Sequence, residues 1–149
     1  MIGAIVAMNS EAEILLGQTE VFRSLTVSGK EVYVGRAFGK DVTVVVCGVG
    51  KVNAALGAQL AVSKFDAEKL FNFGVAGGLN KRTALAGVYQ IEKAVQFDFD
   101  LSQLNGTKVG TLDEYKENYL KLNTFKAPLE KRKLGTADRF NDSTEDFRL

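Results

Sequence analysis

The stretch LFNFGVAGGLN, residues 70–80, places three glycines directly after an apolar run. The run is typical of a buried strand, and Gly74, Gly77 and Gly78 are typical of a turn at the end of that strand. Because glycine has no Cβ, another group can approach the backbone closely at such a turn. The glycines alone do not say what that group is.

The chain before this stretch alternates between strand and helix patterns. IGAIVAM is a buried strand pattern, and it precedes NSEAEILLGQ, for which we expect a helix capped by Asn9 or Ser10. VFRSLTV, EVYVGRAF and DVTVVVCG then predict three strands, joined by hairpin turns at SGK and FGKD. KVNAALGAQLAVSKF has apolar residues at helical spacing, which predicts an amphipathic helix. KLFNFGVAG predicts the next buried strand.

The later part of the chain is more polar. KRTALAGVYQIEKAVQFDFDLS predicts a turn and a long strand. Residues 103–133 are expected to form an excursion or lid within the domain, in which TLDEYKENYLKL is the one fair helix candidate. KLGTADRF predicts a further strand. With no linker-like segment, residues 1–149 are expected to form a single α/β domain.

Composition excludes several function classes. Apolar residues make up 46% of the chain, charged residues 25%, and the formal net charge is +1. We therefore expect neither nucleic acid nor a membrane as a partner. The N-terminus lacks the basic region of a signal peptide, and Cys47 reads as a small buried apolar side chain, so a cytoplasmic protein is expected. The absence of His removes Ser-His and Cys-His catalysis and most zinc sites.

Three patterns carry polar groups that are candidates for chemistry. Glycines 48 and 50 in CGVGKVNAALG lie between a strand and a helix, where exposed N–H groups favour an anion or a hydroxyl-rich ligand. A tight turn without a ligand remains an alternative, and the stretch matches neither a P-loop nor a dinucleotide fingerprint. Glu11 lies near a predicted helix start. Taken alone, it is better explained as a surface residue that the helix dipole favours there than as a functional carboxylate.

QFDFDL is the third pattern. It puts Asp98 and Asp100 on one face of a predicted strand, which permits a metal site or an acid–base pair. We favour solvent-facing carboxylates, with Phe97, Phe99 and Leu101 packed inward.

The order of these motifs resembles that of the nucleoside phosphorylase/nucleosidase superfamily. GAIVAMNSEAE, VVVCGVGKVNAALGAQL, FNFGVAGGL, FDFDLS and GTADRF occur in the expected order. The resemblance is greatest to the 5′-methylthioadenosine/S-adenosylhomocysteine nucleosidase branch, and it is weakest across residues 103–133. It implies a three-layer phosphorylase-like fold with a central mixed sheet flanked by helices. The family's last strand and helix units are not matched in these 149 residues.

The resemblance also implies roles for individual residues. Glu11 resembles the carboxylate that orients and deprotonates the attacking water. The other matched positions imply contacts to the nucleoside. By this resemblance, Met8 contacts the ribose and Val49 lies beside the 5′ substituent. The purine and ribose lie on a wall and floor formed by Gly74, Val75, Ala76 and Gly77. Phe140 stacks on the purine, and the backbone at Asn141 forms a hydrogen bond with the edge of the purine ring.

The implied reaction is hydrolysis of the N-glycosidic bond of adenine nucleosides, releasing adenine without a metal or cofactor. A purine nucleoside phosphorylase is an alternative, although no Arg or Lys lies at the AMNSEAE turn to hold phosphate. An inactive remnant that keeps a nucleoside-binding or dimerisation surface is another. The 5′ substituent stays open.

Two departures from the family pattern affect these expectations. Val75 replaces a Ser or Thr that helps hold the water in many nucleosidases. The motifs that supply the family's ribose-binding Glu and purine-protonating Asp are also absent from the 149 residues. We therefore expect little nucleoside hydrolysis by these residues alone. We also expect a homodimer built on the helix at residues 51–65 and on residues 97–104.

Overall fold

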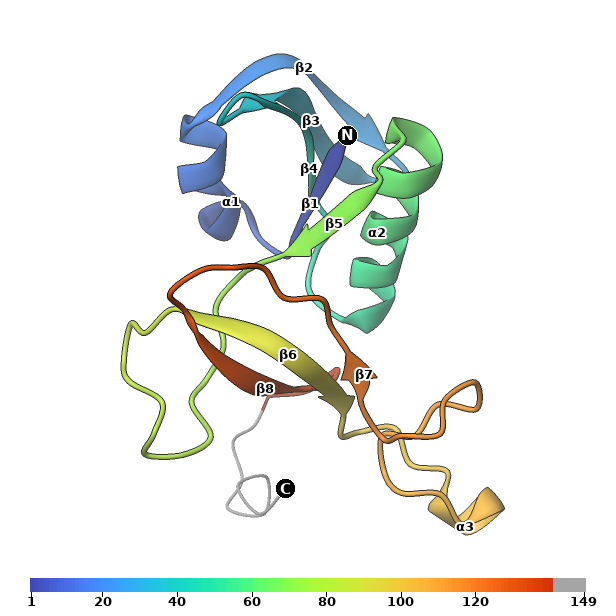
Figure 1. Ribbon diagram of the computed structural model, residues 1–149. Coiled ribbons are helices and arrows are strands. Elements are labelled where there is room, and N and C mark those ends of the chain that lie inside the picture. Colours follow the sequence, from blue (N-terminus) through green and yellow to red (C-terminus); the bar gives the residue numbers. More distant parts are fainter. Residues whose placement is uncertain (141–149) are drawn as a thin grey trace. The chain divides into compact units, whose positions relative to one another are not determined.

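The computed structural model describes residues 1–140, and the chain divides into two units, Met1–Ala76 and Gly77–Leu149. Each unit has a sheet of its own (Figure 1). The single domain expected over residues 1–149 stays a prediction.

The first unit is built on a five-stranded mixed sheet with strand order β2-β3-β4-β1-β5. β1 pairs in parallel with β4 and β5, whereas β3 pairs antiparallel with β2 and β4. The elements in chain order are β1 Ile2–Val6, α1 Asn9–Gly17, β2 Thr19–Val27, β3 Lys30–Ala37, β4 Lys40–Val46, α2 Lys51–Phe65 and β5 Lys69–Asn72.

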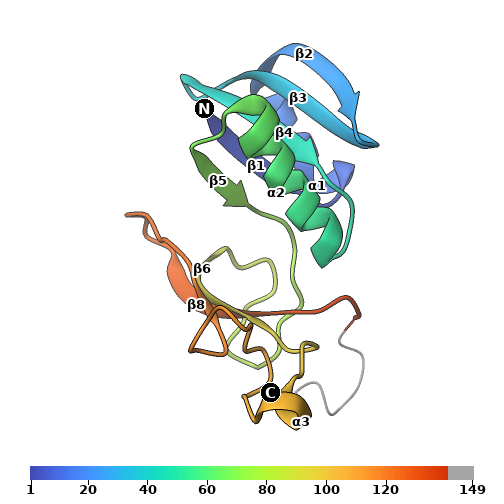
Figure 2. The same cartoon turned by 90° about the vertical axis from the view of Figure 1, so that its right-hand side faces the viewer.

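Side chains from alternate strand positions enter two separate apolar cores. Ile5 and Val45 pack in a core with Leu60 of α2. Val6 and Val44 pack in the other core, with Ala12 of α1 and others. Because successive strand residues point to opposite faces, α1 and α2 cover opposite faces of the sheet, as Figures 1 and 2 show. The predicted α/β class, a mixed sheet flanked by helices, is confirmed.

The local turns explain why this unit follows its sequence closely. Both hairpin turns have two residues with positive φ, Ser28–Gly29 and Phe38–Gly39. Consecutive residues of this kind twist the chain in the sense that two-residue hairpins need. The three strands, the two turns and the helix at residues 51–65 match the sequence predictions.

The predicted cap of α1 is wrong. Neither Asn9 nor Ser10 precedes the helix, because Met8 is the N-cap and no side chain caps the N-terminus. The backbone of Met8 itself is extended, with φ −135° and ψ 151°, and its carbonyl accepts bonds from the N–H groups of Glu11 and Ala12, both at 3.1 Å. The helix therefore begins at Asn9. With Asn9 or Ser10 as the N-cap, it would begin one or two residues later.

The strand predicted as buried at residues 69–77 is also different. β5 contains only Lys69–Asn72, and all four residues are exposed. The reason is topological: β5 is an edge strand, with β1 as its neighbour in the sheet.

The second unit has a three-stranded sheet of order β7-β6-β8. β6 pairs in parallel with β8 and antiparallel with β7. Its elements are β6 Tyr89–Gln96, α3 Ser102–Asn105, β7 Leu120–Lys121 and β8 Glu130–Thr136. Of the strands predicted in this region, the long one is confirmed over residues 89–96 and wrong beyond them, and the one at KLGTADRF is confirmed over residues 133–136.

The helix predicted for TLDEYKENYLKL is wrong, because these residues form turns and bends that end in β7. Leu120 and Lys121 pair with β6, and the Lys93 ammonium lies 4.0 Å from the centre of the Tyr119 ring. Pairing with β6 therefore replaces the local helix preference.

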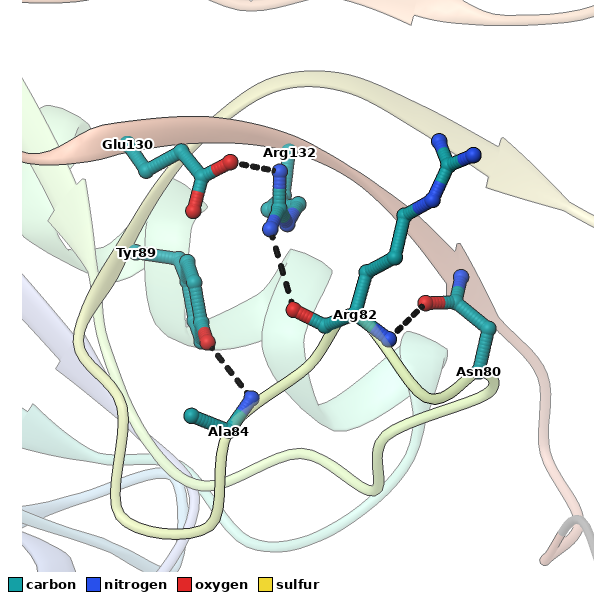
Figure 3. A network of polar contacts seen from close by, with 6 residues as sticks. All are labelled: Asn80, Arg82, Ala84, Tyr89, Glu130 and Arg132. Carbon is teal, nitrogen blue, oxygen red and sulfur yellow. Dashed lines mark hydrogen bonds and ion pairs between the residues drawn. The ribbon is translucent and has the colours of Figure 1, made fainter.

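Polar contacts tie the segment after the glycine stretch to the second sheet (Figure 3). The Ala84 N–H donates to the Tyr89 hydroxyl at 2.8 Å. Arg132 forms an ion pair with Glu130 and donates to the carbonyl of Arg82 at 3.2 Å. These contacts fix the path of the loop that precedes β6. Across residues 1–140, no helix combines the length and the apolar character that crossing a membrane requires.

Candidate active site

Three chain segments of the first unit leave its sheet at the same edge. Met8 follows β1, the turn at residues 48–50 follows β4, and residues 73–76 follow β5. These strands are mutually parallel, so their carboxyl ends meet at one edge. Ligands of open α/β sheets bind outside such an edge. The sheet thus gathers most of the predicted site residues from distant parts of the sequence.

Glu11 lies in the first turn of α1, and its carboxylate reaches the segment after β5. Its Oε1 accepts a hydrogen bond from the Val75 N–H at 2.8 Å. Its Oε2 is buried and has no hydrogen-bond partner in the part of the chain that the structure describes. One oxygen therefore fixes the carboxylate, and the other keeps its acceptor capacity.

Gly74 is small because Glu11 occupies the adjacent space. A Cβ at Gly74 would lie only 2.6 Å from Oε1 of Glu11 and 3.0 Å from its Cδ. The sequence interpretation had the nucleoside pass over this glycine. The structure gives a nearer neighbour: the group that approaches the backbone at Gly74 is a carboxylate of the same chain.

The other two glycines of the stretch lie in the second unit and have different surroundings. A Cβ at Gly77 would meet nothing within 4 Å, whereas one at Gly78 would lie 3.0 Å from Cβ of Thr83. Only Gly77 thus has open space beside it.

Val49 occupies the turn between β4 and α2, and 64% of it is exposed. The Gly48 N–H donates to the carbonyl of Ala7 at 3.1 Å, which fastens the turn to the end of β1. An open cavity of about 400 Å³ lies beside the turn and is lined by Met8, Gly48, Lys30 and neighbouring residues. Met8 and the turn therefore border one hollow of the first unit.

Cys47 precedes this turn and is 1% exposed. Its thiol donates a weak bond to the carbonyl of Gly48 at 3.3 Å. Burial raises the pKa of the Cys47 thiol above its ordinary value. The predicted role of a small buried apolar side chain is confirmed.

The carboxylates of QFDFDL do not lie on a strand, because β6 ends at Gln96 and a turn follows. Asp98 and Asp100 are exposed, and Phe97 and Phe99 are half-buried, so the predicted alternation of exposure is confirmed. Asp98 accepts a bond from the Asp138 N–H. Asp100 accepts one from the Ser102 N–H, and hydrogen bonding by the side chain and then the backbone of Ser102 lowers the pKa of Asp100.

The remaining predicted site residues are less constrained by the structure. Ala76 ends the first unit, and Gly77 begins the second. Phe140 of the second unit is 87% exposed. Asn141 lies outside the described residues. The structure thus brings Met8, Glu11, Val49, Gly74 and Val75 to one sheet edge. The catalytic and binding roles of these five residues stay predictions, as do those of Ala76, Gly77, Phe140 and Asn141.

Lys30 and Asn53 are residues at this edge that sequence reasoning missed. The Asn53 amide donates to the carbonyl of Val49 at 2.7 Å and accepts from the Lys30 ammonium at 2.6 Å. A polar side chain in the first turn of the helix after a glycine turn was the available signal for Asn53. Nothing local marked Lys30, because it lies 23 residues earlier in a hairpin.

The curated proteins similar to this chain include nucleosidases. A 5′-methylthioadenosine/S-adenosylhomocysteine nucleosidase of Listeria monocytogenes is 35% identical over 106 residues, which are 71% of this chain and 46% of the relative. A nucleosidase of the same name from a Marinomonas strain is 35% identical over 102 residues, 68% of this chain and 44% of the relative. The chain therefore spans about half the length of the curated relatives that it matches.

Solved structures show the same fold. The 5′-methylthioadenosine/S-adenosylhomocysteine nucleosidase of Neisseria meningitidis, in complex with methylthio-immucillin-A, has a TM-score of 0.88 at 25% identity, covering 99% of this chain and 68% of the other. The futalosine hydrolase of Helicobacter pylori has a TM-score of 0.88 at 23% identity, with the same coverage, and shows the fold alone. The sequence profile of the phosphorylase superfamily matches residues 1–144, and the chain therefore belongs to that superfamily.

Proposed function

We propose that this protein hydrolyses the N-glycosidic bond of adenine nucleosides of the 5′-methylthioadenosine or S-adenosylhomocysteine type and releases adenine. The observation that carries the proposal is the state of the Glu11 carboxylate, with one oxygen fixed by the Val75 N–H and the other buried without a partner among the described residues. The names of the similar nucleosidases support the same substrate class.

The free oxygen of Glu11 is suited to accept a proton from a water molecule. In the proposed reaction the water oxygen bonds to C1′ of the ribose while the C1′–N9 bond breaks. The bonding electrons leave with adenine, which takes up a proton from the solvent, and one proton of the attacking water passes to Glu11. A positioned general base of this kind contributes roughly 10²–10⁴-fold to a rate. The hydrogen bond from Val75 holds the carboxylate in one orientation while this occurs.

The substrate contacts are part of the proposal. Met8 is assigned to the ribose and Val49 to the 5′ substituent, with the backbone of residues 74–77 beneath the nucleoside. Phe140 is assigned to stacking on the purine and the backbone of Asn141 to its ring edge. An adenine nucleoside is the partner that these assignments imply.

The proposal is tested with protein produced from its complete reading frame, incubated with 5′-methylthioadenosine in the presence and absence of phosphate. We expect adenine and free 5-methylthioribose at the same rate in both conditions. Release that requires phosphate and yields the sugar 1-phosphate would identify a phosphorylase instead. Nucleoside binding with no release of adenine would identify a non-catalytic binding protein.

We also propose that the protein is a cytoplasmic homodimer. The single, buried Cys47 is consistent with a reducing compartment. Exposed apolar side chains on α2 support a protein interface, and they are Val52, Leu56 and Val62.

A further inference from the structure

Val49 is held by backbone hydrogen bonding and not by packing of its side chain. It lies between Gly48 at φ +91° and Gly50 at φ +103°, a backbone path that two glycines make accessible. Its side chain is largely exposed. The carbonyl of Val49 accepts a bond from Nδ2 of Asn53 at 2.7 Å. The direction of the Val49 side chain therefore depends on this contact across the turn.

Lys30 determines which way the Asn53 amide points. Its Nζ lies 2.6 Å from Oδ1 of Asn53. An ammonium group only donates hydrogen bonds and a carbonyl only accepts them, so one orientation of the amide satisfies both Lys30 and Val49. A bond from a charged donor is also stronger than one between neutral groups. Without Lys30, the Val49 carbonyl would be the one remaining group of this contact set that favours the orientation.

The backbone at Gly48 leaves room for the side-chain amide of Asn53. A Cβ at Gly48 would lie 3.2 Å from Nδ2 of Asn53, so glycine leaves the amide its space. Lys30 is in turn fixed by the hairpin, where it pairs with Val27 at the start of β3. Lys30 and Gly48 also line the cavity that Met8 borders. The contact thus joins the β2–β3 hairpin to the turn after β4.

We propose that Lys30 and Asn53 are positioning residues that set specificity for the 5′ substituent of the nucleoside by holding Val49. The assignment of Val49 to the 5′ substituent rests on the proposed function. Neither residue touches the scissile bond. Their effect is on the fit of the group attached to C5′, and it leaves recognition of adenine unchanged.

The first test measures the turn itself by amide hydrogen exchange, followed by NMR. In Asn53→Ala and Lys30→Met, we expect the Gly48 amide, which donates to the carbonyl of Ala7, to exchange about tenfold faster, since each variant loses a bond worth roughly that factor. Ser63→Ala is the matched control, because Ser63 also bonds a carbonyl four residues earlier on α2, at 2.7 Å. Unchanged exchange in variants with native circular dichroism would overturn the proposal.

The second test separates positioning from a general structural role. Dissociation constants for 5′-methylthioadenosine and for adenine are measured by calorimetry with protein from the complete reading frame. We expect both variants to bind 5′-methylthioadenosine about tenfold more weakly and adenine equally well. Lys30→Arg keeps a charged donor and should retain most of the affinity. Equal losses for both ligands, or none, would overturn the assigned role in specificity.

The two tests also distinguish this inference from the proposed function. If the unmodified protein binds neither ligand, the proposed function and the assigned specificity are both wrong. The exchange measurement then still decides whether Lys30 and Asn53 hold Val49.

Discussion

At the scale of single residues, the candidate base depends on the backbone of a distant segment. The Glu11 carboxylate is held by the N–H of Val75, 64 residues away in the sequence. The Val75 side chain is 82% exposed and takes no part in that bond. Replacement of a Ser or Thr by Val at this position therefore removes a hydroxyl and keeps the backbone donor that orients Glu11.

Glu11→Gln is expected to lower kcat by roughly 10²–10⁴-fold, because an amide keeps the size of the carboxylate but is not a general base. Binding of an unreactive adenosine analogue should persist, since the purine is assigned to other residues. Adenine release followed by chromatography and calorimetry with the analogue check the two parts. Turnover close to that of the unmodified protein would contradict the role of Glu11.

Gly74→Ala is expected to displace Glu11, because the added Cβ would lie 2.6 Å from Oε1. The bond to the Val75 N–H would then be lost or lengthened, and kcat should fall at least about tenfold while the fold persists. Gly17→Ala is the matched control: Gly17 ends the same helix as Glu11, and a Cβ there meets nothing within 4 Å. Equal activity of the two variants would show that this close approach has no role.

At the scale of elements, the contact of α2 with the sheet depends on a glycine inside the helix. Gly57 is buried, and a Cβ at this position would lie 2.6 Å from Cβ of Cys47. Glycine weakens a helix interior by about 1 kcal/mol relative to alanine. At this position its absence of a side chain lets α2 pack closely on the end of β4.

Gly57→Ala is expected to destabilise the fold by about 1 kcal/mol. Overpacking costs about 1–3 kcal/mol, and the higher helix propensity of alanine offsets about 1 kcal/mol of that cost. Urea unfolding measures the free energy. A looser α2 should also speed labelling of the buried Cys47 thiol by a disulfide reagent in native buffer. An increase in stability together with slower labelling would show that the site accommodates the methyl group without strain.

At the scale of the whole molecule, association is the property that the exposed surface of α2 predicts. Val52 is 79% exposed and Val62 is 45% exposed on this helix. Two copies related by a two-fold axis would use the same patch on both subunits. The proposed dimer, to which the sequence interpretation also assigned residues 97–104, would remove such apolar groups from water.

Val52→Glu is expected to shift the protein from dimer to monomer, because a dimer would bury the new charge at the proposed interface. Light scattering over a range of protein concentrations gives the molar mass. Ile14→Glu is the matched control, since Ile14 is an apolar residue on α1 that is 82% exposed. A monomeric unmodified protein at high concentration, or equal effects of both changes, would contradict the assigned interface.

The sequence by itself determined the elements whose signals are local. Apolar spacing predicted α2, the two turns with glycine predicted the hairpins, and the apolar run at residues 2–8 predicted β1, because each signal depends on neighbours within one turn or strand. The order of motifs also predicted the superfamily, and the match over residues 1–144 confirms it.

The tertiary structure alone decided how distant residues meet. The bond of Glu11 to Val75 and that of Lys30 to Asn53 span 64 and 23 residues. No periodicity encodes such pairs. Glu11 and Val75 follow parallel strands that end at one edge of the sheet, and Lys30 begins the antiparallel strand that starts at the same edge. The same reason explains the helix wrongly predicted for TLDEYKENYLKL: its pairing partner β6 lies outside the segment, and hydrogen bonds to that strand replace the local preference.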